Sequence, residues 1–489
     1  ARARAGVEAL RDAPLVGPRG PMSLTDEQEA AVLSMATDRT VVLTGGPGTG
    51  KTSVVVSLLR VLARRAYAEG GEAALSREVR LVALAAPTGK AADRLGEAVR
   101  TALARSSDPI DALLDRHLES PRTIHRLLGY RHRVGRSARG TESSFRAHRH
   151  NPLAERLVLV DEVSMIDTVL FERLLSAVSP EASLVLLGDP DQLPSVDPGA
   201  VLRDLLTASP PSVRVSRLTK SHRMDPSDPD GAHVLSVARA CLSTEAVAPP
   251  FRRSRAEDRE TVVGRGGAWQ LDAPELPGVL DAWIARHLLV PALASLDGVD
   301  VGATDEAPEP VRAALAQLSL ARILTVTRRA AEDLDAYVSA SFARWRGEPQ
   351  RARRVLPGEP VMVVHNDYDA DLWNGDAGVA WRDRGGETLV SFRRGTGVRT
   401  RPLAAVAHLV ERSHAVTVHK AQGSEHDEIL FVMPPVDTAL SSREIVYTAI
   451  TRARRSAIVV ARPELLEVAL RRASTRETGL VEALSGHGG

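Results

Sequence analysis

Residues 40–52 read TVVLTGGPGTGKT, and this stretch indicates the fold class of the chain. Residues 40–44 are a short apolar run, typical of a buried β-strand. Residues 45–52 match the pattern G-x-x-x-x-G-K-[ST], a glycine-rich loop whose backbone N–H groups surround phosphate oxygens at the start of a helix. A strand, such a loop and a helix in this order predict a nucleotide-binding α/β domain.

The residues of this loop are expected to share the work of holding a nucleotide. Lys51 is expected to reach the terminal phosphates, and the Thr52 hydroxyl to bind Mg²⁺. The candidate nucleotide-binding residues are Gly45, Gly46, Pro47, Gly48, Thr49, Gly50, Lys51, Thr52 and Ser53.

Two carboxylates follow another apolar strand in RLVLVDE, residues 156–162. Asp161 is expected to hold Mg²⁺ together with Thr52, and Glu162 to polarise the attacking water. A strand end that happens to be acidic is the alternative, but the glycine-rich loop upstream favours chemistry. The two motifs together predict hydrolysis of a nucleoside triphosphate and not binding alone.

Two further strand ends carry polar side chains. GDPDQLPSV, residues 188–196, places Gln192 where it is expected to sense the γ-phosphate. APTGKAADRL, residues 86–95, places Lys90 at the start of a helix, where it suits a phosphate of a nucleic-acid backbone. Taken alone, the second segment predicts only a capped helix start.

The composition narrows the classes of function. The net charge is +1 over 489 residues, so a nucleic acid would have to bind in a local channel. No run of 18 or more apolar residues exists, which excludes a membrane-spanning helix. The N-terminal 20 residues lack the apolar segment of a signal peptide. The single cysteine, Cys241, fits a reducing compartment, so we expect a cytoplasmic protein.

Lysine is rare in this chain. Of 63 basic residues, all are arginine except Lys51, Lys90, Lys220 and Lys420. A compact ammonium group fits where a planar guanidinium does not. The four lysines are therefore candidate functional residues, and Lys420 lies within AVTVHKAQGSE at 415–425.

Short apolar strands alternate with helical segments along the chain, which is the pattern of parallel α/β layers. Two series of strands predict two α/β units. The strands expected are 40–44, 80–86, 156–160 and 183–187 in the first unit, and 322–327, 415–419, 428–433 and 456–461 in the second.

Three other segments break this pattern. Residues 357–405 contain short alternating strands between turns, which predict a small β-barrel inserted in the second unit. Residues 131–150 are basic and without periodicity, and are either a solvated loop or a DNA contact. Residues 240–315 carry no motif.

An ordered set of motifs covers about residues 24–470. It comprises LTDEQ, GGPGTGKT, LAAPTGKAADRL, TIHRLLG, LVDEVSMID, GDPDQLPSV, LTKSHR, AVTVHKAQGSE and REIVYTAITRARR. This set resembles that of the superfamily 1 helicases, and most closely the RecD family, the α subunits of the RecBCD (exonuclease V) complex.

The resemblance implies the fold in more detail. It implies two RecA-like P-loop domains, with a helical or loop insertion at about 98–150 and a small SH3-like β-barrel insertion. The expected domains are an N-terminal remnant or linker at 1–23, domain 1A at 24–215, domain 2A at 216–356 and 406–489, and the barrel, domain 2B, at 357–405.

The resemblance also implies the roles of single residues. Gln28 is implied to read the adenine, which makes ATP the nucleotide and Mg²⁺ its metal. Arg223 and Arg452 are implied to reach the γ-phosphate, beside the catalytic Lys51, Asp161, Glu162 and Gln192. The DNA-binding residues implied are Pro87, Thr88, Lys90, His125, Thr417, His419, Lys420, Gln422 and Ser424.

Several alternatives stay open at the level of these residues. His125 either contacts DNA or packs on an amphipathic helix. Lys420 either faces a phosphate or packs nearby. Trp373 and Trp381 either stack on bases or belong to the core or rim of the small barrel.

The implied function is an ATP-dependent 5′→3′ helicase acting on single-stranded and tailed double-stranded DNA. The resemblance implies work with RecB-like and RecC-like subunits, as a heterotrimer, in double-strand break repair and recombination. A stand-alone 5′→3′ helicase and an ATP-gated clamp with a silent motor are the alternatives. The RecD family has an N-terminal partner-docking domain, whereas only about 23 residues precede the first motif here, which leaves partner docking open.

Overall fold

The chain divides into two compact units. The computed structural model describes residues 2–17, 20–130, 145–221, 228–243, 248–253, 262–301, 307–348, 355–367, 370, 372–394, 397–474 and 479–485. Unit 1 comprises Ala1–Pro190, Pro194–His222 and Arg476–Gly489, and unit 2 comprises Asp191–Leu193 and Arg223–Thr475. Two α/β units were expected from the two series of strands.

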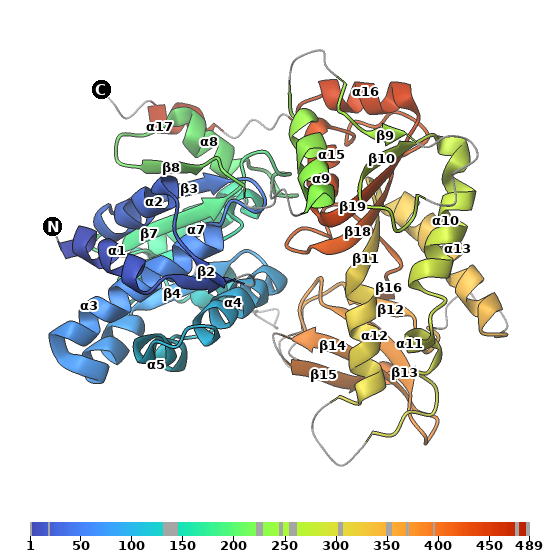
Figure 1. Ribbon diagram of the computed structural model, residues 1–489, viewed down its shortest axis with the longest axis horizontal. Helices are drawn as coiled ribbons and strands as arrows, with labels where there is room; N and C mark the ends of the chain where they lie inside the picture. The colour runs from blue at the N-terminus through green and yellow to red at the C-terminus, as the bar shows by residue number, and fades with distance from the viewer. Residues whose placement is uncertain are drawn as a thin grey trace, which may run out of the picture. The chain divides into compact units, whose positions relative to one another are not determined.

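A six-stranded parallel sheet forms the centre of unit 1, in the order β5-β4-β6-β7-β3-β8 (Figure 1). Its inner strands are almost wholly apolar because helices cover both faces of a parallel sheet. The strands are β3 (Thr40–Gly45), β4 (Val82–Ala86), β5 (Arg122–Thr123), β6 (Leu157–Val160), β7 (Ser183–Gly188) and β8 (Arg214–Leu218).

Alternate residues of this sheet enter two separate cores. Val41 and Leu43 pack with α1 to α5, whereas Val42 between them packs with α6, α7 and α8. The helices are α2 (Asp26–Thr37), α3 (Lys51–Val79), α4 (Gly89–Ala104), α5 (Pro109–His117), α6 (Ile124–Leu127), α7 (Thr168–Ala177) and α8 (Val201–Ala208).

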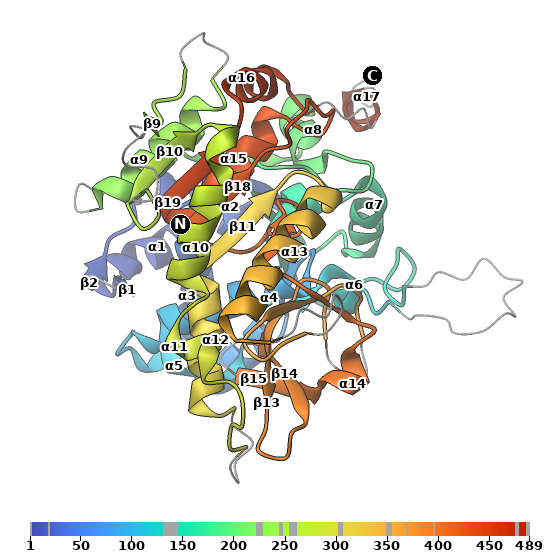
Figure 2. The same ribbon diagram turned by 90° about the vertical axis from the view of Figure 1, so that its right-hand side faces the viewer.

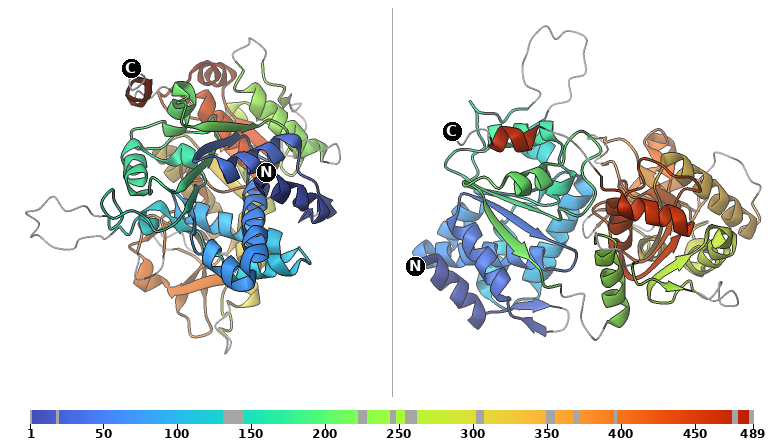
Figure 3. Two further views of the ribbon diagram at one scale, coloured as in Figure 1. Left: turned by 90° about the vertical axis from the view of Figure 1, so that its left-hand side faces the viewer. Right: turned by 90° about the horizontal axis from the view of Figure 1, so that it is seen from above.

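The two ends of the chain both pack on unit 1. Residues expected to be a remnant or linker form α1 (Arg2–Asp12) and the antiparallel pair β1 (Leu15–Gly17) and β2 (Gly20–Met22). Helix α17 (Leu480–Ser485), expected in the second domain, packs on α8 through Leu480 and Leu484. Figure 3 shows α1 and α17 on opposite sides of the unit 1 sheet.

Unit 2 contains a second six-stranded parallel sheet, in the order β17-β11-β18-β19-β10-β9. The four strands expected from the sequence lie together in it. The strands are β9 (Arg252–Arg253), β10 (Gly267–Leu271), β11 (Ala321–Thr325), β17 (Ala415–Thr417), β18 (His426–Val432) and β19 (Ala453–Val460).

Helices cover both faces of this sheet as well. Ile323 and Leu430 pack with α10, α12 and α13, while Leu324 and Phe431 pack with α9, α15 and α16. The helices are α9 (Pro229–Ala240), α10 (Leu276–His287), α11 (Pro291–Ala294), α12 (Glu309–Leu320), α13 (Arg328–Trp345), α15 (Arg443–Thr451) and α16 (Pro463–Arg471). Among the described helices of both units, none is long and apolar enough to cross a membrane.

A five-stranded antiparallel sheet is inserted in unit 2, in the order β15-β14-β13-β12-β16. Figure 2 shows it beside α12. It occupies the segment where a small barrel was expected, and it extends beyond residue 405 because β16 pairs with β12. The strands are β12 (Pro360–Val363), β13 (Ala377–Arg382), β14 (Thr388–Arg394), β15 (Gly397–Pro402) and β16 (Val410–Arg412), with α14 (Leu403–Val406) before β16.

Both tryptophans of the insertion are buried, and Trp381 packs in the core cluster that also contains residues of α10, α12 and α13. Trp381 is fully buried, and its Nε1 donates a hydrogen bond to Ser391 Oγ over 2.9 Å. Trp373 is 5% exposed. These positions match the core alternative and not base stacking. The basic segment at 131–150 lies largely outside the described residues, which omit 131–144.

Candidate nucleotide site and strand-binding residues

The glycine-rich loop joins β3 to α3 at the carboxyl edge of the unit 1 sheet. Gly48 and Gly50 have φ values of +73° and +85°, which only glycine adopts readily. The Lys51 Nζ donates hydrogen bonds to the carbonyl oxygens of Gly45 (2.5 Å) and Gly46 (3.3 Å). The lysine ammonium therefore lies against its own loop, where phosphate oxygens are expected to bind.

The remaining residues of the loop lie beside this lysine. Thr49 Oγ1 donates a hydrogen bond to the Gly46 carbonyl over 2.9 Å and closes the loop. Pro47 is buried, and Thr52 and Ser53 are half-buried in the first turn of α3. The sequence-predicted loop residues thus form one continuous structure.

Gln28 joins the loop to helix α2. Its side chain accepts a hydrogen bond from the Thr25 backbone N–H, and Thr25 Oγ1 accepts one from the Gln28 N–H, which is a capping box. The Gln28 Nε2 also donates to the Thr49 carbonyl over 3.1 Å. The amide is 3% exposed, so Gln28 is a structural link between α2 and the loop in this structure.

Asp161 and Glu162 follow β6, which lies two strands from β3 in the sheet. Burial, and then the charge of Glu162, raise the pKa of Asp161 to about 6, against the opposing charges of Lys51 and Arg94. The influence of Lys51 on this pKa means that the loop lysine and the Asp161 carboxylate are close enough to interact.

Glu162 has an unusual backbone conformation. Its φ is +55° and its ψ +41°, the left-handed region that a residue with a Cβ seldom adopts. Its N–H donates to Asp161 Oδ1 over 2.8 Å, and a short 3₁₀ turn, Val163–Met165, follows. Strained backbones of this kind cluster at functional sites.

The segment after β7 carries Gln192. Gln192 is 6% exposed, and residues Asp191–Leu193 group with unit 2. Within unit 2, the Leu193 N–H donates to Thr448 Oγ1 over 3.0 Å, and its carbonyl accepts from Gln422 Nε2 over 2.9 Å. Gln192 is therefore adjacent to a residue held by two of the unit 2 motifs.

Three strand-binding candidates of unit 1 follow β4. Pro87, Thr88 and Lys90 are half-buried, and Thr88 caps α4 by accepting a hydrogen bond from the Ala91 N–H over 3.2 Å. Lys90 lies in the first turn of that helix. β4 and β6 are adjacent parallel strands, so Lys90 and Asp161 follow strands that end at the same edge of the sheet.

His125 packs in an aromatic cluster. Its ring centroid is 5.5 Å from that of Tyr130 and 5.8 Å from that of Phe145. Burial lowers the pKa of His125, opposed by the charge of Asp167. This environment matches the packed alternative for His125.

The motif at 415–425 divides into two parts. Thr417, His419 and Lys420 are half-buried, and Thr417 Oγ1 accepts a hydrogen bond from the Lys420 N–H over 3.3 Å. Gln422 and Ser424 are 5% and 7% exposed and hold backbone carbonyls, of Leu193 and Ala421 respectively. In this structure the two buried side chains support the loop, and the first three lie nearer the surface.

Of the two arginines implied to reach the γ-phosphate, one lies in the described structure. Arg452, at the end of α15, is 2% exposed and donates to the carbonyls of Ser424 (3.2 Å) and Thr448 (3.4 Å). Arg223 lies outside the described residues.

Curated relatives resemble this chain over nearly its whole length. A RecBCD enzyme subunit RecD of Mycolicibacterium smegmatis is 36% identical over 468 residues, which cover 94% of this chain and 75% of the relative. The chain belongs to the RecD family. A RecBCD enzyme subunit RecD of Mycobacterium tuberculosis is 36% identical, covering 94% and 73%. The ATP-dependent RecD2 DNA helicase of Deinococcus radiodurans is 31% identical, covering 95% and 53%.

Family models and solved structures are also similar to this RecD-family chain. Residues 28–198 match an AAA domain, and residues 412–460 match a UvrD-like helicase C-terminal domain. The Pif1 helicase from Candida albicans has a TM-score of 0.47 and 16% identity, covering 95% of this chain and 100% of that chain. A Pif1 helicase from Bacteroides, in complex with ADP-AlF3 and ssDNA, has a TM-score of 0.42 and 16% identity, covering 96% and 98%.

The candidate nucleotide site of this chain has a donor set suited to a divalent cation. Thr52 offers a hydroxyl and Asp161 a half-buried carboxylate, and hard divalent cations prefer oxygen ligands of this kind. Burial and the neighbouring Glu162 carboxylate both raise the pKa of Asp161, and a cation bound there would favour its charged form. The residues therefore fit a nucleotide bound with a divalent metal ion.

Arg328, a cation at an edge of the unit 2 sheet, was not among the site residues predicted from the sequence motifs. It opens α13, directly after β11, and Thr327 caps that helix by accepting a hydrogen bond from the Ala330 N–H. The signal was its place just after a predicted parallel strand, at the edge of an α/β sheet where ligands commonly bind.

Proposed function

We propose that this RecD-family protein is an ATP-dependent helicase that moves 5′→3′ along one strand of DNA. The observation that carries the proposal is that the phosphate-binding loop and Asp161 follow β3 and β6 at the carboxyl edge of one parallel sheet, which joins the loop to the acidic strand end. A loop alone would support binding, whereas the loop with Asp161 and Glu162 supports hydrolysis.

The residues of unit 1 take the following parts in ATP hydrolysis. Lys51 binds the terminal phosphates, and Thr52 and Asp161 hold Mg²⁺, which when bound offsets the negative charge of the phosphates. Glu162 orients the attacking water and accepts its proton. Its fixed, strained backbone holds that carboxylate in one position.

The other residues assigned to the nucleotide act on the base and on the γ-phosphate. The family resemblance assigns Gln28 to the adenine, which its amide could reach only by leaving its hydrogen bonds with Thr25 and Thr49. It assigns Gln192 to the γ-phosphate. Arg223 and Arg452 bring positive charge to the γ-phosphate, where negative charge develops during hydrolysis. The bonds that Arg452 makes to the Ser424 and Thr448 carbonyls link it to the strand-binding loop of unit 2.

The strand is bound by residues of both units. Pro87, Thr88 and Lys90 belong to unit 1, where His125 packs in its aromatic cluster as a supporting residue, and Thr417, His419, Lys420, Gln422 and Ser424 belong to unit 2. The surface residues contact backbone phosphates, while buried Gln422 and Ser424 hold the loop in shape. Phosphate contacts fix position without reading sequence, as a translocating motor requires.

The names of the M. smegmatis and M. tuberculosis relatives support a role as the RecD subunit of a RecBCD-type complex, with RecB-like and RecC-like partners. Such a complex would act in double-strand break repair and recombination. The single cysteine, Cys241, supports a cytoplasmic protein, because it offers no partner for a disulfide within the chain. A stand-alone helicase remains the second candidate, because the D. radiodurans relative is named an ATP-dependent RecD2 DNA helicase.

The test is ATP-dependent unwinding of 5′-tailed and 3′-tailed DNA duplexes, with Lys51→Gln as the control variant. We expect unwinding of the 5′-tailed duplex alone and none by the variant. Unwinding without partners would favour the stand-alone helicase. DNA-stimulated ATP hydrolysis without unwinding would favour a motor that needs RecB-like and RecC-like subunits. No ATP hydrolysis by folded protein would refute the proposed motor.

A further inference from the structure

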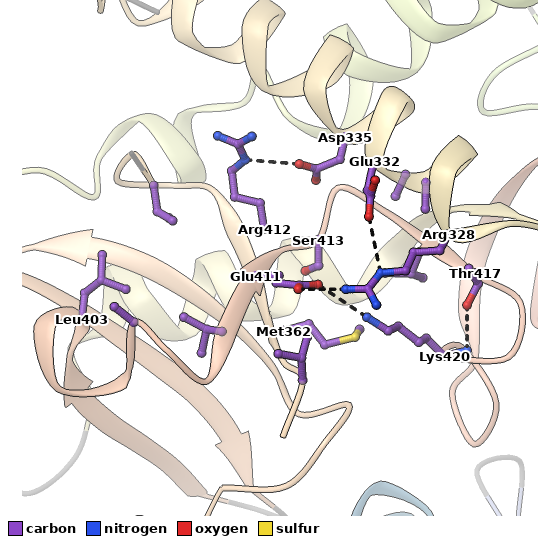
Figure 4. Close-up of a pocket in the computed structure, with 17 residues that line it drawn as sticks. Arg328, Glu332, Asp335, Met362, Leu403, Glu411, Arg412, Ser413, Thr417 and Lys420 are labelled. Carbon is purple, nitrogen blue, oxygen red and sulfur yellow. Dashed lines mark hydrogen bonds and ion pairs between the residues drawn. The ribbon is translucent and has the colours of Figure 1, made fainter. Parts of the chain in front are cut away.

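A pocket of about 980 Å³ opens in unit 2 beside the strand-binding loop. Figure 4 shows that its walls come from α13, from β16 of the antiparallel sheet, and from the segment that carries Thr417 and Lys420. Met362 and Val410 contribute to an apolar part, while charged side chains gather at one side. The pocket therefore joins the inserted sheet to the proposed strand-binding surface.

One carboxylate in this pocket lies between two cations. Glu411 Oε1 is 3.3 Å from Arg328 Nη2, and Glu411 Oε2 is 3.6 Å from Lys420 Nζ. Figure 4 shows the guanidinium and the ammonium converging on the same carboxylate. A group with two anionic oxygens thus already bridges these cations, and a DNA phosphate also presents two.

The fold itself brings the two cations together. β11 and β17 are adjacent parallel strands, with Thr325 paired to Thr417 at their ends. Arg328 and Lys420 each follow one of these ends by three residues. The carboxylate comes from elsewhere, since Glu411 pairs with Met362 in the antiparallel sheet.

The other charged side chains of the pocket do not bridge Arg328 and Lys420. Arg412 pairs with Asp335 over 3.2 Å, and both side chains are largely buried. Glu332 pairs with Arg328 through Nε, over 3.4 Å, whereas Glu411 pairs with it through Nη2. Glu411 is therefore the carboxylate that the two cations share.

We propose that Arg328 and Lys420 form a phosphate subsite for the DNA strand, and that Glu411 occupies this subsite when no strand is bound. The exposed fractions of the three side chains are 73%, 35% and 48%, and ion pairs this exposed stabilise a protein little. A phosphate can therefore displace the carboxylate at small cost. The returning carboxylate favours release of the phosphate, which suits a motor that must let go at each step.

This subsite rests on the proposed function, since it assumes that unit 2 binds a strand. It adds Arg328 as a phosphate contact and Glu411 as a competitor. A purely structural ion pair would have no effect on strand affinity when its carboxylate is neutralised. The two possibilities are therefore distinguished by binding measurements on the full chain.

The test measures anisotropy of a fluorescein-labelled oligo(dT) strand across a salt series. We expect Glu411→Gln to bind about twofold to fivefold tighter at low salt, because both cations become available to phosphate. We expect Arg328→Ala to bind more weakly and to lower the slope of log K against log[salt] by about 0.7. In the Arg328→Ala background, the gain from Glu411→Gln should shrink, because only Lys420 is then released.

The matched control lies on the same helix and away from the pocket. Arg329 and Asp333 form an exposed pair at 3.3 Å, so Asp333→Asn removes one surface charge as Glu411→Gln does. We expect Asp333→Asn to leave the affinity unchanged. If Asp333→Asn and Glu411→Gln gained the same affinity for the strand, the effect would come from net charge and the subsite would be refuted. No gain in affinity for Glu411→Gln would also refute it. Failure of the wild-type chain to bind any strand would instead refute the proposed function, and the subsite with it.

Discussion

At the scale of single residues, Glu162 combines two features that can be separated by mutation. Its φ of +55° is set by the turn, and its carboxylate is the proposed general base. Glu162→Gln keeps the size and backbone and removes only the charge. We expect ATP turnover to fall about 10²–10⁴-fold while nucleotide affinity persists, because general-base catalysis contributes on that order. Steady-state ATP hydrolysis and nucleotide titration measure the two effects. Turnover within threefold of wild type would exclude Glu162 as the base.

The rarity of lysine gives a second prediction at this scale. The Lys51 Nζ fits against two loop carbonyls, at 2.5 and 3.3 Å, in a space shaped for a small ammonium. A guanidinium is planar and larger, so Lys51→Arg is not conservative here. We expect Lys51→Arg to lose ATP hydrolysis as fully as Lys51→Gln, with thermal stability close to that of wild type. Wild-type turnover in Lys51→Arg would mean that charge alone is needed.

At the scale of elements, a buried ion pair joins α3 to α5. Arg60 and Asp111 are 1% and 0% exposed, with Arg60 Nη2 2.8 Å from Asp111 Oδ2. Removing one partner leaves an uncompensated buried charge, so Asp111→Ala should lower the free energy of unfolding by about 3–5 kcal/mol. Urea denaturation measures this change. The double variant Arg60→Met/Asp111→Leu should recover most of it, and a double variant no more stable than Asp111→Ala would contradict this account.

The buried carboxylate of Glu359 links α13 to the inserted sheet and makes the stability of the protein depend on pH. Burial raises the pKa of Glu359, but the hydrogen bond and charge of His414, with hydrogen bonds from Ser339 and Leu356, outweigh it and hold the pKa below 4.5. A lowered pKa contributes stability above the unfolded value, and that stability is lost as the pH falls through the folded value. We expect Glu359→Gln to lower the free energy of unfolding by about 1.5–3 kcal/mol at pH 7.

Thermal unfolding at several pH values tests this account of Glu359. The difference in Tm between wild type and Glu359→Gln should be constant from pH 7 to about 5 and should shrink below pH 4.5, where the wild-type carboxylate becomes protonated. Asp333→Asn removes an exposed carboxylate from α13 and should leave the pH profile unchanged. A difference that stays constant down to pH 3 would assign the effect to packing instead of charge.

The elements also show what a sequence can reveal. Inner strands such as β3 and β7 were predicted because both faces are buried and their central residues are a continuous apolar run. β8 was missed because, at the edge of its sheet, it buries only Leu218 and carries two arginines. β10 was missed because GAWQL resembles neither a continuous apolar run nor a regular alternation.

The sequence predicted part of the candidate site and missed part of it, as it did for the strands. Motif position predicted Lys51, at the end of the glycine-rich loop, and Asp161, directly after a predicted strand. It did not reveal that Gln422 and Ser424 are buried, because polar side chains that hold backbone carbonyls look in sequence like ligand contacts. Nor did it reveal Glu411, whose pairing with Lys420 depends on how an antiparallel sheet inserts beside a parallel one.

At the scale of the whole molecule, the path of the chain between units was the hardest feature to predict. Helix α17 returns to unit 1 through two leucines four residues apart, Leu480 and Leu484, a pattern too short to indicate which core it joins. The 191–193 segment groups with unit 2 although it follows a strand of unit 1. Such long-range pairings depend on tertiary packing and leave little trace in local sequence.

The last prediction concerns how the two units share one strand. Lys90 belongs to unit 1 and Lys420 to unit 2, and the net charge of +1 gives the molecule little general attraction for DNA. If each lysine binds one phosphate of the same strand, Lys90→Ala and Lys420→Ala should each lower the salt slope of binding by about 0.7, and the double variant by about 1.4. The effects should add because the lysines lie in different units.

Anisotropy with oligo(dT), in the presence of a non-hydrolysable ATP analogue, measures these slopes in one nucleotide state. Arg329→Ala, which removes an exposed cation of α13, should leave the slope unchanged. A double variant with the slope of either single variant would mean that the two lysines do not hold the strand at the same time. Only one unit at a time would then hold the DNA strand, even with the ATP analogue bound. Stepping along the strand would then depend on more than the nucleotide state.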